Sequence, residues 1–173
     1  MTALLLVFLL LIVFSPMLVE AHRAAQNERR QLERGGVEPV GDVYKVMQIA
    51  YPAVFLGMIG EGMWRTSEFA FSDGVVAGFV IFALAKLLKW WAIRSLGDAW
   101  TFRVIVRPGV RLVASGPYRW LRHPNYVAVI GELAGVALMS GARIAGPIGT
   151  LVFGLLMLRR ISVEERALAA VGR

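Results

Sequence analysis

Residues 115–126 read Ser-Gly-Pro-Tyr-Arg-Trp-Leu-Arg-His-Pro-Asn-Tyr, a short polar, basic and aromatic stretch between long apolar segments. Pro117 and Pro124 fix their own φ angles and bias the preceding residues away from the α region, so one unbroken helix is not expected. The stretch therefore predicts a shaped loop. Its arginine, histidine, asparagine and tyrosine side chains can recognise a polar molecule by charge-assisted hydrogen bonds and stacking. A loop whose arginines only set membrane topology is the alternative.

The composition around this loop is typical of an integral membrane protein. Of the 173 residues 57% are hydrophobic, and the mean hydropathy is +0.62, whereas about half of a soluble domain is apolar. Basic residues confined to membrane-flanking loops explain the net charge of +7, so a nucleic-acid partner is not expected. The chain has no cysteine and only two histidines. This excludes disulfides and a cysteine nucleophile, and no metal site is expected.

Five apolar runs account for most of the chain. They cover residues 3–19, about 46–64, about 74–93, 126–140 and 144–158. A membrane-spanning helix needs about 20 residues, so the last two runs lie near the lower limit. Because only a short turn separates these two, we expect them to form a helical hairpin. The sequence predicts an all-α integral membrane protein with about five transmembrane helices in a single membrane domain, residues 1–173.

The polar segments between these runs carry most of the charges. Residues 20–45 are predicted to begin as an interfacial helix and to end in a turn, and residues 65–73 to form a short link. Lys86 and Lys89, near the end of the third run, are expected to extend their ammonium groups to the membrane interface. Glu61, near the end of the second run, is expected to reach the lipid headgroups.

The distribution of basic residues predicts the orientation of the chain. Residues 20–45, 94–125 and 159–173 contain five, six and four Lys or Arg residues. Lys86 and Lys89 flank the same side, which gives seventeen of the 19 basic residues. Since cytoplasmic loops carry the excess of Lys and Arg, we expect the loop and the carboxyl terminus in the cytoplasm. The first span is then retained, with its amino end outside.

A longer pattern around the loop resembles a known family. The run from Leu112 to Tyr126 follows Trp91-x-x-x-x-Leu96-Gly97-x-x-Trp100 and precedes Glu164-Glu165-x-x-Leu168. This pattern is similar to that of the isoprenylcysteine carboxyl methyltransferase family, whose wider relatives include membrane phospholipid methyltransferases. The resemblance covers residues 85–173 and implies a methyltransferase-like core there. Residues 1–84, the N-terminal spans, match no motif.

The resemblance implies S-adenosylmethionine as the cofactor, bound by the cytoplasmic loop and tail. Matching the motif position by position assigns the cofactor-binding residues as Leu112, Val113, Tyr118, His123, Pro124, Asn125, Tyr126 and Glu164. Arg160 matches the family's arginine at the methyl acceptor, where it can hold an anionic oxygen in line with the methyl group. Arg160 and Glu164 share one face if the last helix continues through them.

The reaction implied by the resemblance is methyl transfer to an oxygen of a lipophilic acceptor. The family name implies the carboxylate of a prenylated cysteine. A phenol or enol acceptor would need a base, for which Glu132, inside an apolar run, is a candidate. Two alternatives stay open. Membrane sterol and steroid reductases that use NADPH carry a similar Arg-His-Pro-Asn-Tyr motif, although Tyr118 stands where they are expected to have tryptophan. A non-enzymatic membrane subunit or scaffold whose basic loops bind lipid or a partner is the other alternative.

Overall fold

The protein folds into a bundle of α-helices. The structure, a computed structural model, describes residues 2–65, 72–110 and 112–171. The helices found there are α1 (Thr2–Glu33), α2 (Tyr44–Arg65), α3 (Asp73–Leu96), α4 (Pro124–Ser140) and α5 (Ala145–Val171), with the short 3-10 helices η1 (Gly97–Ala99) and η2 (Gly116–Arg119). Four of them are long and apolar enough to cross a membrane, and α4 is a shorter apolar helix. The predicted all-α membrane fold with about five spans is confirmed.

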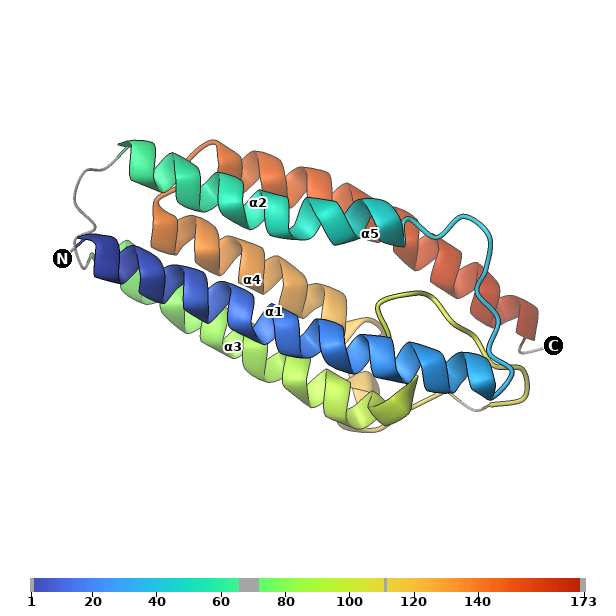
Figure 1. Cartoon of the computed structure of the whole chain (residues 1–173). Coiled ribbons are helices and arrows are strands. Elements are labelled where there is room, and N and C mark those ends of the chain that lie inside the picture. The colour runs from blue at the N-terminus through green and yellow to red at the C-terminus, as the bar shows by residue number, and fades with distance from the viewer. Residues whose placement is uncertain (1, 66–71, 111, 172–173) are drawn as a thin grey trace.

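The three basic segments lie at one end of this bundle. Figure 1 shows the link after α1, the loop between α3 and α4, and the carboxyl end of α5 at the end opposite the amino end of α1. An antiparallel bridge between Val37 and Val106 joins the link to the loop. The arrangement agrees with the prediction that these segments share one side of the membrane. Of the predicted link at residues 65–73, residues 66–71 lie outside the described part.

Helix α1 is longer than the sequence predicts. The expected span at residues 3–19 and the expected interfacial helix form one helix that ends at Glu33. No glycine or proline interrupts residues 17–34, so nothing in the backbone favours a break there. Asn27 and Gln31 in its second half are each 4% exposed. The prediction of an interfacial helix is therefore wrong, because this half packs against the rest of the protein.

The hairpin of α4 and α5 is confirmed, and α5 continues well beyond residue 158. The carboxylate of Glu61 accepts hydrogen bonds from the backbone N–H groups of Arg143, Ile144 and Ala145, at 3.0, 3.1 and 2.6 Å. These are donors at the start of a helix, which need a partner from outside it. Glu61 therefore caps α5, a role that the sequence analysis missed, and its position relative to the lipid headgroups stays a prediction.

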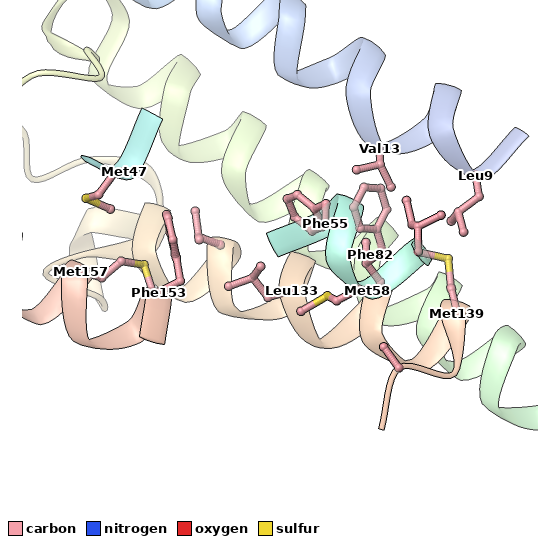
Figure 2. Close-up of a cluster of buried hydrophobic side chains, with 14 of the residues drawn as sticks. Leu9, Val13, Met47, Phe55, Met58, Phe82, Leu133, Met139, Phe153 and Met157 are labelled. Atoms are coloured by element: carbon pink, nitrogen blue, oxygen red, sulfur yellow. The ribbon is translucent and has the colours of Figure 1, made fainter. Parts of the chain in front are cut away.

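Helix α4 lies at the centre of the bundle and packs against α2, α3 and α5. Figure 2 shows apolar side chains from all five helices meeting around it, among them Phe55, Phe82 and Leu133. A methyl group added at Gly78 of α3 would lie 2.6 Å from the carbonyl oxygen of Gly135. Small residues let membrane helices approach closely, as here. This packing fixes α4, and with it the motif residues at its amino end.

Candidate active site

The motif residues form a shaped turn that leads into α4, as predicted. Gly116 has a φ of 59°, a conformation that glycine adopts at little cost. The N–H groups of Trp120 and Leu121 donate to the carbonyl of Pro117 at 3.1 and 3.0 Å. Pro124 is the first residue of α4, a position where its missing N–H costs nothing. The turn therefore holds the side chains before and after Pro124 at the end of the bundle.

Three predicted site residues form one hydrogen-bonded chain. The Tyr126 hydroxyl donates to Oε2 of Glu164 at 3.0 Å and accepts a hydrogen bond from Nε of Arg160 at 2.9 Å. Tyr126 lies in the first turn of α4, and the two charged residues lie one turn apart on α5. The sequence prediction that Arg160 and Glu164 share a face is confirmed, because α5 is continuous here.

Further polar groups surround the outer side of this chain. His123 lies with Nδ1 4.0 Å from Glu164 Oε2 and with Nε2 3.4 Å from Glu165 Oε1. The two glutamate side chains are 32% and 42% exposed, so a ligand can reach them. Burial, and then the negative charge of Glu164, raise the pKa of the Tyr118 phenol above its usual range. Tyr118 is therefore a neutral hydrogen-bond donor near this carboxylate.

The remaining predicted cofactor residues lie around the same turn. The carbonyl oxygen of the Asn125 side chain accepts a hydrogen bond from the indole of Trp100 at 3.4 Å. Pro124 is buried, Val113 is half-buried, and Leu112 is 70% exposed. The contacts of these four residues with a cofactor stay predictions.

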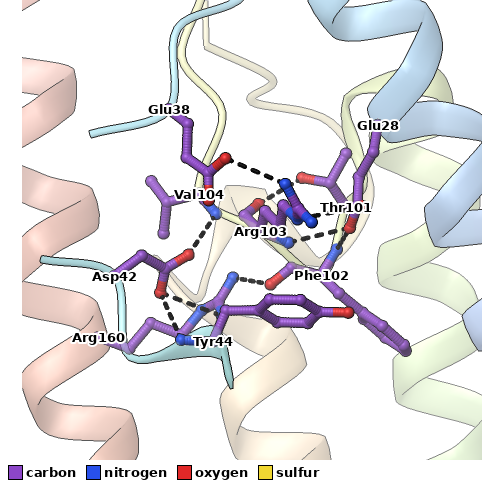
Figure 3. A network of polar contacts seen from close by, with 9 residues as sticks. All are labelled: Glu28, Glu38, Asp42, Tyr44, Thr101, Phe102, Arg103, Val104 and Arg160. Atoms are coloured by element: carbon purple, nitrogen blue, oxygen red, sulfur yellow. Dashed lines mark hydrogen bonds and ion pairs between the residues drawn. The ribbon is translucent and has the colours of Figure 1, made fainter. Parts of the chain in front are cut away.

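Arg160 has two more partners, which Figure 3 shows. Its Nη2 donates to the backbone carbonyl of Phe102, and its Nη1 lies 3.5 Å from Oδ1 of Asp42. The arginine side chain is 9% exposed and the aspartate side chain 4% exposed. The sequence analysis missed Asp42, although an aspartate just before a helix is a common capping residue. That signal predicts a cap but does not reveal the pairing with α5.

Glu132, the candidate base, lies in a different place from Arg160. Glu132 lies six residues after Tyr126, the hydrogen-bond partner of Arg160. Six residues span about 9 Å along an α-helix. Glu132 is fully buried and accepts a hydrogen bond from the Tyr51 hydroxyl. The ammonium groups of Lys86 and Lys89 lie 3.2 and 3.3 Å from its two carboxylate oxygens. A role for Glu132 in catalysis stays a prediction.

These two lysines also pair with a second buried carboxylate. Glu20 of α1 lies 2.9 Å from Lys86 and 2.7 Å from Lys89. We call Glu20, Lys86, Lys89 and Glu132 the buried quartet; it holds two positive and two negative charges. The prediction that the lysines extend to the membrane interface is therefore wrong, because acidic partners inside the bundle hold both ammonium groups.

The fold and the site together define a multi-pass α-helical membrane protein with a polar, partly exposed site at one end of its bundle. The chain belongs to the isoprenylcysteine carboxyl methyltransferase family, whose model matches residues 76–170. This confirms the resemblance found in the sequence and indicates a membrane methyltransferase.

Two curated relatives match most of the chain. The uncharacterised protein YpbQ of Bacillus subtilis is 30% identical over 84% of this chain and 85% of its own length. An uncharacterised protein of Haemophilus influenzae is 26% identical over 83% of each chain. No solved structure matches the chain.

Proposed function

We propose that this protein transfers a methyl group from S-adenosylmethionine to an oxygen atom of a lipophilic acceptor in the membrane. The observation that carries the proposal is the chain from Arg160 through Tyr126 to Glu164 at one end of the bundle. It places a cation and a partly exposed carboxylate on either side of one phenol. Membership in the methyltransferase family supports the class of reaction.

The chemistry of the side chains in this site fits the cofactor. S-adenosylmethionine carries an ammonium group, ribose hydroxyls and a sulfonium, all of which favour nearby oxygen acceptors and negative charge. Glu164 and Glu165 present such oxygens at partly exposed positions. When bound, the cofactor supplies an electrophilic methyl group with a neutral leaving group. Among the described residues, no group of three or more His, Cys, Asp or Glu side chains is placed to hold a metal ion.

In this proposal, the residues of the chain bind the cofactor and orient the acceptor. Glu164 accepts hydrogen bonds from the cofactor, and Tyr126 fixes the direction of that carboxylate. Among the residues that the structure describes, three of the five N–H donors of Arg160 have partners, which leaves two for an oxygen of the acceptor. Because Arg160 is 8% exposed, the site also keeps water away from that oxygen.

The acceptor in this proposal enters from the lipid. The five apolar helices leave many large apolar side chains exposed on their outer faces, so the bundle sits in the hydrocarbon and meets lipophilic molecules there. A prenylated cysteine carboxylate is ionised and needs no base. A phenol or enol must lose a proton, and Glu132 is our candidate to receive it. The excess of Lys and Arg at this end of the chain supports a cytoplasmic position for the site and the carboxyl terminus.

Calorimetric titration of the purified protein in nanodiscs tests the proposal. S-adenosylmethionine and S-adenosylhomocysteine should bind, and NADPH should not. Binding should be lost in Glu164→Ala and retained in Arg160→Ala, because only the first residue is assigned to the cofactor. Selective binding of NADPH would instead support a reductase. If folded protein bound none of the three, the enzyme proposal would fail in favour of a scaffold.

A further inference from the structure

The Asp42 carboxylate is fixed by the backbone on both of its oxygens. Oδ1 accepts a hydrogen bond from the N–H of Tyr44 at 3.1 Å, and Oδ2 accepts one from the N–H of Val104 at 2.9 Å. The side chain is 4% exposed. It is therefore a rigid, buried group, unlike an exposed ion pair whose two side chains move freely. Its Oδ1 faces the guanidinium of Arg160 (Figure 3).

The backbone carbonyl of Phe102, a second partner of Arg160, belongs to a loop segment that side chains of the N-terminal part of the chain hold in place. The Glu28 carboxylate of α1 accepts hydrogen bonds from the N–H groups of Phe102 and Arg103, each at 3.2 Å. The Phe102 carbonyl, in turn, accepts a hydrogen bond from Arg160. On α1, the neighbouring side chain of Asn27 donates to the carbonyl of Trp100 at 2.7 Å. Helix α1 thus fixes the loop segment that Arg160 contacts.

These contacts assign a role to a part of the chain that the sequence left without one. Asn27, Glu28 and Asp42 lie before residue 76, where the match to the family model begins. An orienting arginine acts only if its planar guanidinium is held in one direction, because small displacements reduce the rate strongly. In this protein the helix α1 and the link after it supply much of that restraint.

We infer that Asp42 is a positioning residue for Arg160, and that α1 with its link forms one wall of the reaction site. The inference rests on the proposed function, in which Arg160 orients the acceptor oxygen. Asp42 and Tyr126 contact different nitrogen atoms of the guanidinium: Asp42 pairs with Nη1, and the Tyr126 phenol accepts a hydrogen bond from Nε. Loss of Asp42 should therefore disturb the acceptor step and spare the carboxylate that binds the cofactor.

The test compares Asp42→Asn with a matched control in the same link. Glu38 also pairs with an arginine, lying 3.2 Å from Arg103, but it is 39% exposed. Full-length variants in nanodiscs would be assayed for the Kd of S-adenosylmethionine and for kcat and KM. The acceptor probes are S-farnesyl-N-acetylcysteine and a long-chain alkylphenol. Asp42→Asn should lower kcat at least tenfold and leave the cofactor Kd within twofold, and Glu38→Gln should change neither.

The outcomes separate this inference from the proposed function. An unchanged kcat in Asp42→Asn, or a loss of cofactor affinity as large as the loss of kcat, would overturn the positioning role. If that variant does not fold, Asp42→Glu replaces it: a lower kcat with retained cofactor affinity supports the inference, and an unchanged kcat overturns it. Wild-type protein that binds no S-adenosylmethionine would instead contradict the proposed function itself.

Discussion

Replacing Glu20 by methionine should markedly lower the midpoint temperature of thermal unfolding. The change leaves Lys86 and Lys89 with one carboxylate in place of two, at a site where Glu20 is 1% exposed. Breaking a buried ion pair by removing one partner costs about 3–5 kcal/mol. At about 2–4 °C per kcal/mol for a chain of this size, the midpoint should fall by about 6–20 °C.

The assay is thermal unfolding in detergent, followed by tryptophan fluorescence. Glu33→Met, at an exposed position of the same helix, is the control and should change the midpoint little. The double variant Glu20→Met with Lys86→Met restores equal numbers of positive and negative charges. It should be more stable than the sum of the single changes predicts, by about 1–3 kcal/mol. Strict additivity, or a cost below about 1 kcal/mol for Glu20→Met, would refute the account of the buried quartet.

Three further variants test local features. Glu61→Ala removes the cap of α5 and should cost about 0.5–2 kcal/mol of unfolding free energy without changing cofactor affinity; an unchanged midpoint would contradict this. Gly116→Ala brings a Cβ into Ser95 at a φ of 59°, so methyl transfer should fall at least tenfold, and normal turnover would contradict the shaped turn. Tyr126→Phe removes the hydroxyl between the two charged groups and should weaken cofactor binding severalfold by calorimetry; unchanged affinity would contradict its role.

The sequence predicted the features that depend on local patterns. Apolar runs define the helices because each must bury its backbone polar groups within itself in lipid. The motif prolines place the start of α4 correctly, since proline suits the first helical position. Family resemblance assigned Arg160, Tyr126 and Glu164 to one site, and helical spacing predicted that the two charged residues share a face; the hydrogen bonds through Tyr126 were not predicted. Arg160 and Glu164 lie 34 and 38 positions after Tyr126 in the sequence. Sequence spacing alone therefore does not predict these two hydrogen bonds.

The features that the sequence analysis got wrong or missed depend on partners distant in the chain. A lysine near the end of an apolar run usually reaches the interface, but Lys86 meets Glu20, 66 residues away. Glu61 likewise finds donors more than 80 residues away, at the start of α5. Asp42 carries an ordinary capping signal, so its pairing with Arg160 could not be read from its neighbours. Each error or omission follows from tertiary contacts that local preference does not reveal.

Transfer of labelled methyl groups tests the central claim most directly. The protein in nanodiscs would be incubated with S-adenosylmethionine tritiated in its methyl group and with either S-farnesyl-N-acetylcysteine or a long-chain alkylphenol. The account predicts tritium in the organic extract with at least one of these acceptors, and its loss in Glu164→Ala and in Arg160→Ala. Folded wild-type protein that transfers no label to either probe, or to lipids of membranes enriched in the protein, would contradict it.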